Sequence, residues 1–151
     1  MKIAVFLHVL GAILFIGNIA TAAFWKIRAE RGNDLGHLHR TVRNVMLADF
    51  IFTLPGILLV LGSGVFLTLQ LGYSLTEVNW LTISLGLFAI TGLIWVAILL
   101  PSQSAMVRHS REAIDSGQLG PEYRRASRTW DLFGTAATIL PLIILYFMTT
   151  R

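Results

Sequence analysis

Residues 3–25 read IAVFLHVLGAILFIGNIATAAFW and decide the fold, because they form an apolar run without a charged residue. A helix needs about 20 residues to cross the hydrocarbon core of a bilayer, so this run predicts a retained transmembrane helix rather than a cleaved signal. His8 lies inside it, on a helix face of small residues that includes Gly11 and Ala12. Such faces are where membrane helices pack together. We therefore expect His8 to point into a protein interior, where an ionisable side chain is a candidate functional residue.

Three further apolar runs are long enough to span a membrane, and the four predicted helices cover residues 3–25, 46–71, 80–100 and 130–148. The chain of 151 residues is 55% hydrophobic and 13% charged, whereas about a quarter of the residues of an average soluble domain are charged. The runs are continuous and do not fit the alternating strands of a β-barrel. The sequence thus predicts an all-α polytopic membrane protein, one four-transmembrane-helix bundle over residues 1–151.

The basic residues predict the orientation of this bundle. Ten of the twelve lie in the connecting segments 26–45 and 101–129, so the positive-inside rule places both segments in the cytoplasm as loops and both termini outside. We expect a bacterial-type inner membrane protein whose partner is the lipid bilayer, with no nucleic acid. Faces rich in glycine and alanine also fit a homo-oligomer or a membrane-protein partner.

The absence of cysteine excludes disulfides, thiolate metal sites, iron–sulfur clusters and covalently attached haem. His37, His39 and His109 lie in the predicted loops, where a solvated histidine is the expected interpretation. The acids and histidines are too scattered to define a metal site or a nucleophile with its base, so we assign no metal ligand and no catalytic residue. The pattern favours a protein without enzyme activity.

The second apolar run carries a polar stripe that includes Asp49 and Thr53 and is expected to face the bundle. Two interpretations of Asp49 are open. In the first, it reaches interfacial water or pairs with Arg43 or Arg40 near the membrane surface, and this interpretation is favoured. In the second, it has a proton-carrying or substrate role and is buried beside polar residues predicted on the same side of the membrane, namely Asn18, Gln103 and Trp130.

Prolines and capping residues predict where the helices begin and end. Pro101 is a natural terminator of the third helix, and Thr129 is placed to cap the fourth. Residues 32–36 form an expected turn between an extension of the first helix and a lead into the second. Pro121 is typical of a helix start that could continue towards the fourth span.

A b-type haem between transmembrane helices needs two axial ligands at one depth, one from each side of the porphyrin. His8 supplies one imidazole near the outer end of the bundle, while the loop histidines belong to the opposite side of a core about 30 Å thick. Met148 is expected near the same depth as His8, and its thioether sulfur can ligate haem iron. The alternatives are a second His8 in a dimer, and a Met148 that serves only in packing.

Several motifs together resemble an uncharacterised bacterial family of four-helix integral membrane proteins over essentially the whole chain. They are Leu7-His8-Val9-Leu10-Gly11 with Gly17, Gly62-Ser63-Gly64, Trp80, the segment from Pro101 to Met106, and Trp130 with Gly134, Pro141 and Met148.

This layout is distantly similar to CopD copper-resistance membrane domains and to HemJ-type protoporphyrinogen oxidases, which also place a histidine early in helix one. The second resemblance implies that His8 is the haem-associated histidine. HemJ-type proteins carry a functional lysine after a Trp-Leu pair, whereas Thr82 follows Trp80-Leu81 here. The resemblance therefore does not carry the oxidase activity over.

Two hypotheses of function remain. The first is a redox-related membrane protein that binds haem b through His8, with Met148 or a second subunit providing the other ligand. The second is a non-enzymatic membrane component without a cofactor, either a transport-related bundle or a partner subunit, in which His8 and Asp49 are packing or proton-sensitive groups.

Overall fold

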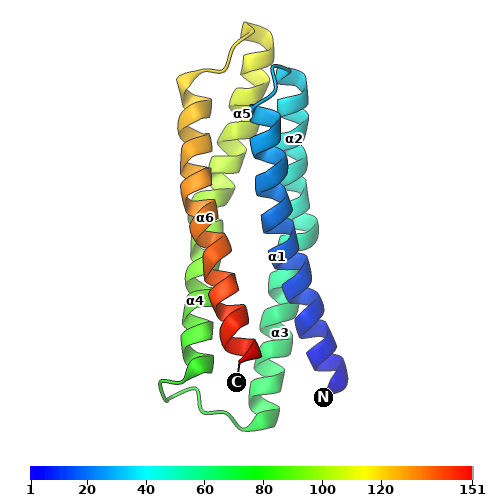
Figure 1. The fold of residues 1–151 in the computed structure, drawn as a ribbon, viewed down its shortest axis with the longest axis vertical. Coiled ribbons are helices and arrows are strands. Elements are labelled where there is room, and N and C mark those ends of the chain that lie inside the picture. The colour runs from blue at the N-terminus through cyan, green and yellow to red at the C-terminus, as the bar shows by residue number, and fades with distance from the viewer. Residues whose placement is uncertain (151) are drawn as a thin grey trace.

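The computed structural model describes residues 1–150, which are helical apart from short connections and contain no strand. Four long rods lie side by side (Figure 1). Their segments in chain order are α1 (Lys2–Glu30), α2 (Leu35–Ala48), the π-helical segment η1 (Asp49–Thr53), α3 (Leu54–Leu71), α4 (Trp80–Ile94), the π-helical segment η2 (Trp95–Leu99), α5 (Leu100–Ser116) and α6 (Pro121–Thr149).

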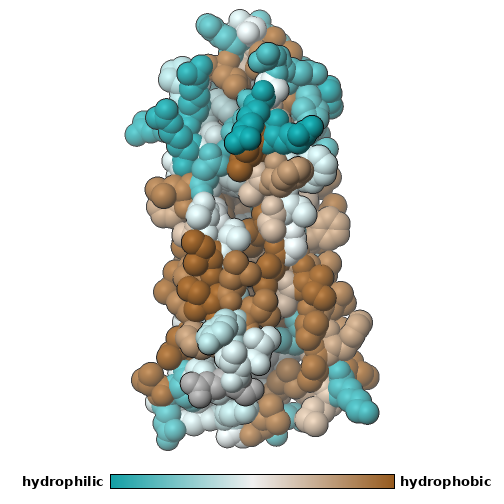
Figure 2. All heavy atoms as spheres, viewed as in Figure 1, coloured by the Kyte–Doolittle hydropathy of each residue, from teal (hydrophilic) through white to brown (hydrophobic). Residues whose placement is uncertain are grey.

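Each rod is long and apolar enough to cross a membrane, which confirms the predicted fold class. Large apolar side chains such as Ile13, Leu58 and Leu93 are more than half exposed, as expected of a surface that faces lipid. Figure 2 shows a wide apolar band around the middle of the bundle, with hydrophilic residues gathered at the end formed by α2, α5 and the start of α6. We call this end the basic end, and the opposite end, which holds both chain termini, the terminal end.

The rods extend beyond the predicted spans at the basic end. The expected loops 26–45 and 101–129 are largely helical, and only residues 31–34 and 117–120 connect the rods there. The extensions are helical because they bury apolar side chains against one another, among them Leu38, Val42, Met106 and Tyr123. Thr129 consequently lies inside α6 and does not cap its start.

The turns that join the rods are fixed by local chemistry. The Asp34 side chain caps α2 by accepting a hydrogen bond of 2.8 Å from the His37 backbone N–H. That bond favours the carboxylate and lowers the pKa of Asp34 from its ordinary value. Gly117 ends α5 at φ +78°, a left-handed conformation that suits glycine. At the terminal end, Asn79 and Thr82 form a capping box that starts α4.

Two prolines lie inside the second and third rods in chain order, and neither ends its rod. Pro55 and Pro101 each come two residues after a π-helical segment. A proline ring lacks the N–H donor and clashes with the carbonyl group four residues earlier. In η2 the backbone bond runs instead over five residues, from the Leu100 N–H to the Trp95 carbonyl group, so the wider turn accommodates the ring. The prediction that Pro101 ends the helix is therefore wrong, and the rod continues to Ser116.

The helices α1 and α3 are in very close contact at two glycines. A Cβ atom on Gly56 would lie 2.9 Å from the Gly11 carbonyl oxygen, and one on Gly11 would lie 2.8 Å from the Gly56 carbonyl oxygen. Both distances are shorter than a van der Waals contact, so only glycine allows the two backbones to approach this closely. This contact fixes the position of His8, which lies one turn before Gly11.

We expect Gly56→Ala to destabilise the protein by about 1–3 kcal/mol, because the new methyl group meets backbone atoms that cannot move aside. Gly62→Ala is the matched control, since nothing lies within 4 Å of a Cβ at that position on the same helix. Thermal unfolding in detergent measures the difference. Equal melting temperatures for the two variants would contradict the packing assigned to Gly56.

Candidate functional site

At the terminal end the four rods separate into two pairs. α1 packs on α3 and α4 packs on α6, while no Cα atom of α3 lies within 8 Å of one in α4. Two hollows of ≈ 110 Å³ and ≈ 580 Å³ lie between the pairs. Five residues line both of them, namely His8, Val60, Phe88, Ile144 and Met148. We call this combined space the terminal slot.

His8 enters the terminal slot from α1 with one ring nitrogen already engaged. Its Nδ1 atom lies 3.1 Å from the Ser63 hydroxyl oxygen on α3. Because the Ser63 hydroxyl has one hydrogen and donates it to the Leu59 carbonyl oxygen, we assign Nδ1 of His8 as the donor in the first bond. In the neutral ring this leaves Nε2 with a lone pair, the tautomer that a metal-ligating histidine requires.

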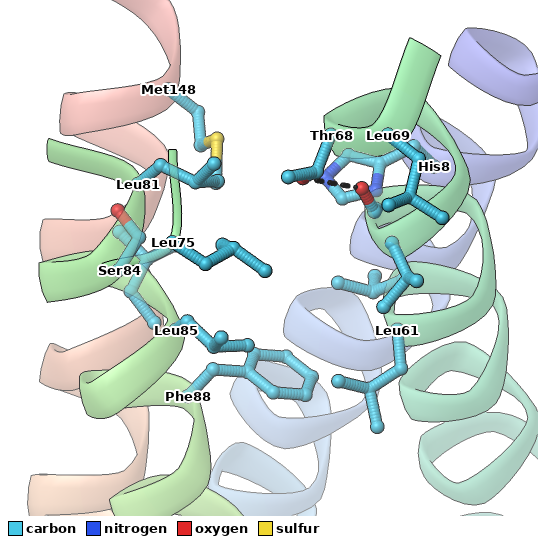
Figure 3. Close-up of a pocket in the computed structure, with 14 residues that line it drawn as sticks. His8, Leu61, Thr68, Leu69, Leu75, Leu81, Ser84, Leu85, Phe88 and Met148 are labelled. Carbon is cyan, nitrogen blue, oxygen red and sulfur yellow. Dashed lines mark hydrogen bonds between the residues drawn. The ribbon is translucent and has the colours of Figure 1, made fainter. Parts of the chain in front are cut away.

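Met148 lines the terminal slot from α6, opposite His8 (Figure 3). The walls between them are mostly apolar, with Leu61, Leu85 and Phe88 on either side. Phe88 packs against Phe15 of α1 at a ring-centroid distance of 5.8 Å and bridges the two helix pairs. The structure thus brings the two sequence-predicted haem ligands, His8 and Met148, to one space.

The other polar side chains of the terminal slot are engaged by their own helices. Thr68 donates to the Gly64 carbonyl oxygen at 2.8 Å, and Ser84 donates to the Trp80 carbonyl oxygen at 2.7 Å. No other residue that lines the two hollows, all of them described, carries an ionisable side chain. His8 is therefore the group of the terminal slot that can accept a proton, and it shares the ability to bind a metal with the thioether of Met148.

Asp49 forms a second polar centre, nearer the basic end, where it is 5% exposed. Its Oδ1 atom accepts hydrogen bonds from Asn18 Nδ2 at 2.7 Å and from the Thr53 hydroxyl at 2.9 Å. Its Oδ2 atom accepts one from Gln103 Nε2 at 2.6 Å, and Trp95 Nε1 lies 3.4 Å away. Four donor groups from three rods thus surround this one carboxylate.

This arrangement contradicts the first interpretation of Asp49 and agrees with the burial that the second one requires, while the functional role in the second stays a prediction. Asp49 is buried beside Asn18 and Gln103, as the second interpretation required, and Trp130 lines the same cavity. Within residues 1–150 it forms no ion pair, so the favoured pairing with Arg43 or Arg40 is wrong. Arg40 and Arg43 do not pair with Asp49, because α2 carries them away from the membrane core. The side-chain amides of Asn18 and Gln103 lie on neighbouring rods at the depth of Asp49 and donate to it instead.

Trp95 is a member of this centre that the sequence analysis did not single out. Asp49 and Trp95 are the first residues of η1 and η2, and both segments precede a Leu-Pro pair. π-helical turns often occur at functional sites, where they re-aim a side chain. In the sequence, a Leu-Pro pair follows five residues after Asp49 and again five residues after Trp95, and this repeat could have indicated the two π-helical segments.

A buried ionic cluster around Lys26 was also missed, because Lys26 comes directly after the first apolar run and was assigned to a loop. Its side chain is fully buried, with Nζ 2.6 Å from Asp131 Oδ1, 3.1 Å from Glu30 Oε2 and 2.6 Å from the Ser127 hydroxyl oxygen. The ammonium group also lies 5.4 Å from the centre of the Trp130 ring. The cluster joins α1 to α6.

We expect Lys26→Met to destabilise the protein by about 3 kcal/mol, because it leaves Glu30 and Asp131 without their common cation. Asp131 is 45% exposed, so water screens part of the loss and the lower end of the usual range applies. Lys2→Met, at an exposed position of the same helix, is the control. If chemical unfolding in detergent gave the same stability for both variants, the cluster would not hold α1 on α6.

The remaining histidines lie apart from both centres. His39 is buried rather than solvated, and its Nδ1 atom lies 2.8 Å from the Ser110 hydroxyl oxygen of α5. His37 is exposed, and His109 pairs with Glu112 on the surface. The described residues contain no group of three or more histidine, cysteine, aspartate or glutamate side chains that could hold a metal ion.

The fold and these centres define a polytopic helical membrane protein with polar groups enclosed by its spanning helices. A family model described as "Predicted integral membrane protein (DUF2269)" matches residues 2–151. The chain belongs to this family, which confirms the expectation of an uncharacterised membrane family. Neither a curated protein nor a solved structure gives a significant match.

Proposed function

We propose that this integral membrane protein binds haem b in the terminal slot and serves in a redox-related role. The observation that carries the proposal is that His8 and Met148 line one apolar space from opposite walls, with Nε2 of His8 left free by the Ser63 hydrogen bond. An imidazole and a thioether are a known axial pair of haem iron. Haem b, when bound, supplies a one-electron carrier.

The residues of the terminal slot fit such a group in four respects. The apolar walls match the porphyrin faces, and the larger hollow of ≈ 580 Å³ lies in the usual range of about 300–1,000 Å³ for cofactor sites. The slot lies between two helix pairs, α1 with α3 and α4 with α6, so the two proposed ligands come from different pairs. Ser63 holds the His8 ring in one tautomer, as second-shell partners of ligating histidines do.

The basic end supports an orientation for this proposal. With Arg31, Arg40, Arg43 and the arginines of α5 and α6 facing the cytoplasm, both termini and the terminal slot lie at the outer side of a bacterial-type inner membrane. The resemblance to CopD domains and HemJ-type oxidases, which carry an early helix-one histidine, agrees with a ligand role for His8. A second subunit that contributes its own His8 is the alternative to Met148.

Absorption spectroscopy of protein purified in detergent after expression with ample haem tests the proposal. We expect a Soret band in the wild type, its loss in His8→Ala, and an altered spectrum and reduction potential in Met148→Leu, because each variant removes one proposed ligand. His37→Ala is the control, since His37 is an exposed histidine outside the terminal slot.

A wild-type protein without a Soret band, or a band unchanged in His8→Ala, would contradict haem binding through His8. It would favour the cofactor-free alternative, a transport-related bundle or a partner subunit. An unchanged spectrum in Met148→Leu, together with a dimer in solution, would favour a second His8 as the other ligand.

We also expect Ser63→Ala to weaken haem binding by about 10- to 100-fold, since it removes the hydrogen bond that fixes the His8 tautomer. Ser84→Ala is the matched control, because Ser84 lines the same hollow but donates only to its own helix. Haem titration of the apoprotein followed at the Soret band gives both affinities. Equal affinities would show that Ser63 does not position His8.

A further inference from the structure

A separate cavity of ≈ 350 Å³ lies nearer the basic end, between α1, η2, α5 and α6. Its lining includes Asp49, Gln103, Trp130 and Asp131. We call it the Asp49 cavity. It shares no lining residue with the two hollows of the terminal slot.

Two polar atoms of the Asp49 cavity lack a hydrogen-bond partner among residues 1–150, the Gln103 Oε1 atom and the Trp130 Nε1 atom. Both side chains are more than nine-tenths buried. The Gln103 amide cannot relieve this by turning over, because its Nε2 atom donates to the Asp49 carboxylate. An unpaired buried polar group costs about 1–3 kcal/mol, so these atoms mark the place of an occupant that both donates and accepts hydrogen bonds.

The charges around the Asp49 cavity indicate the sign of that occupant. Asp49 has neutral donors only, and the described part of the chain offers it no ion pair. Lys26 is the cation of this region, and it is shared between Glu30 and Asp131. The two ionisable side chains that line the cavity, Asp49 and Asp131, are both acids, so the lining carries an excess of acidic groups. A positive occupant offsets this excess.

The size and the aromatic walls narrow the chemistry further. The Asp49 cavity is roughly ten times the share of liquid volume that one water molecule takes, about 30 Å³. The Trp95 and Trp130 rings line it, and the face of an indole attracts ammonium groups, as the position of Lys26 over Trp130 illustrates. Gln103 Oε1 needs a donor, which a protonated amine supplies, and Trp130 Nε1 needs an acceptor, which an oxygen atom on the same molecule supplies.

We propose that the Asp49 cavity is a binding site for a small primary ammonium group that carries a neighbouring oxygen acceptor. Access is lateral, between α1 and α6, where Ile27, Thr135 and Ile139 are exposed and Asp131 is 45% exposed. The ammonium group comes either from a free amino alcohol or from an ethanolamine lipid headgroup, which share this chemistry. The site is independent of haem binding.

Tryptophan fluorescence emission of the full-length protein in detergent tests this site. Trp25 and Trp80 are replaced by Phe, so that the emission comes only from Trp95 and Trp130 in the cavity. We expect ethanolamine at neutral pH to change the emission saturably. Ethylene glycol, which has the same size but no charge, is expected to have no effect. Asp49→Asn and Gln103→Met should each weaken ethanolamine binding at least tenfold, while Asp115→Asn, an exposed acid of α5, should not.

A second arm of the experiment separates the two sources. The same titration is run in nanodiscs of phosphatidylcholine alone and in nanodiscs that also contain phosphatidylethanolamine. A higher apparent Kd for ethanolamine in the second case assigns the site to the lipid headgroup, and equal values assign it to the free amine. Equal responses to ethanolamine and ethylene glycol, or no response to ethanolamine, would overturn the proposal and indicate that water fills the cavity. This comparison uses the protein without a change at Asp49, so it holds even if the Asp49→Asn variant does not fold.

Discussion

The structure depends on how a carboxylate is kept inside a bundle that stands in lipid. No water in the hydrocarbon core can satisfy Asp49, so its hydrogen bonds come from the protein. They come from Asn18 on α1, Thr53 on the same rod and Gln103 on the third rod, with Trp95 nearby. One side chain therefore ties three rods together at a fixed depth. Removing any donor would leave a buried carboxyl oxygen with one hydrogen bond fewer, which explains why side chains of three rods converge at this place.

The two π-helical segments solve a related problem for the backbone. A proline in a continuous membrane helix frees a carbonyl group that lipid cannot satisfy. Placing a five-residue π turn before Pro55 and before Pro101 keeps both rods continuous. The same turns place Asp49 and Trp95 at the point where the two rods face each other. The π-helical segments thus do two things at once: they make room for the prolines, and they position the polar centre around Asp49.

The four-rod architecture could be predicted from the sequence because hydrophobicity over about 20 residues depends little on tertiary detail. The common depth of His8 and Met148 could be predicted for the same reason, since helix length fixes it, whereas their position in one space is known only from the structure. The surroundings of Asp49, Lys26 and His39 could not be predicted, because they depend on which helix faces lie against each other. Lys26 is the clearest case. Its position after an apolar run indicates an exposed loop. In the fold, however, α6 packs against α1 and brings Asp131 and Ser127 to Lys26.

The difference between the two ends of the bundle follows from what fills each interface. Gly11 and Gly56 allow α1 and α3 to approach so closely that these two helices form one tight pair at the terminal end. The bridge between the two pairs is then left to bulky contacts such as Phe15 against Phe88, and open space remains beyond them. At the basic end, ion pairs and hydrogen bonds of Lys26, Asp49 and His39 close the same gap. Because these directional contacts end at Asp49, the terminal end is the part of the fold with room for a large apolar group.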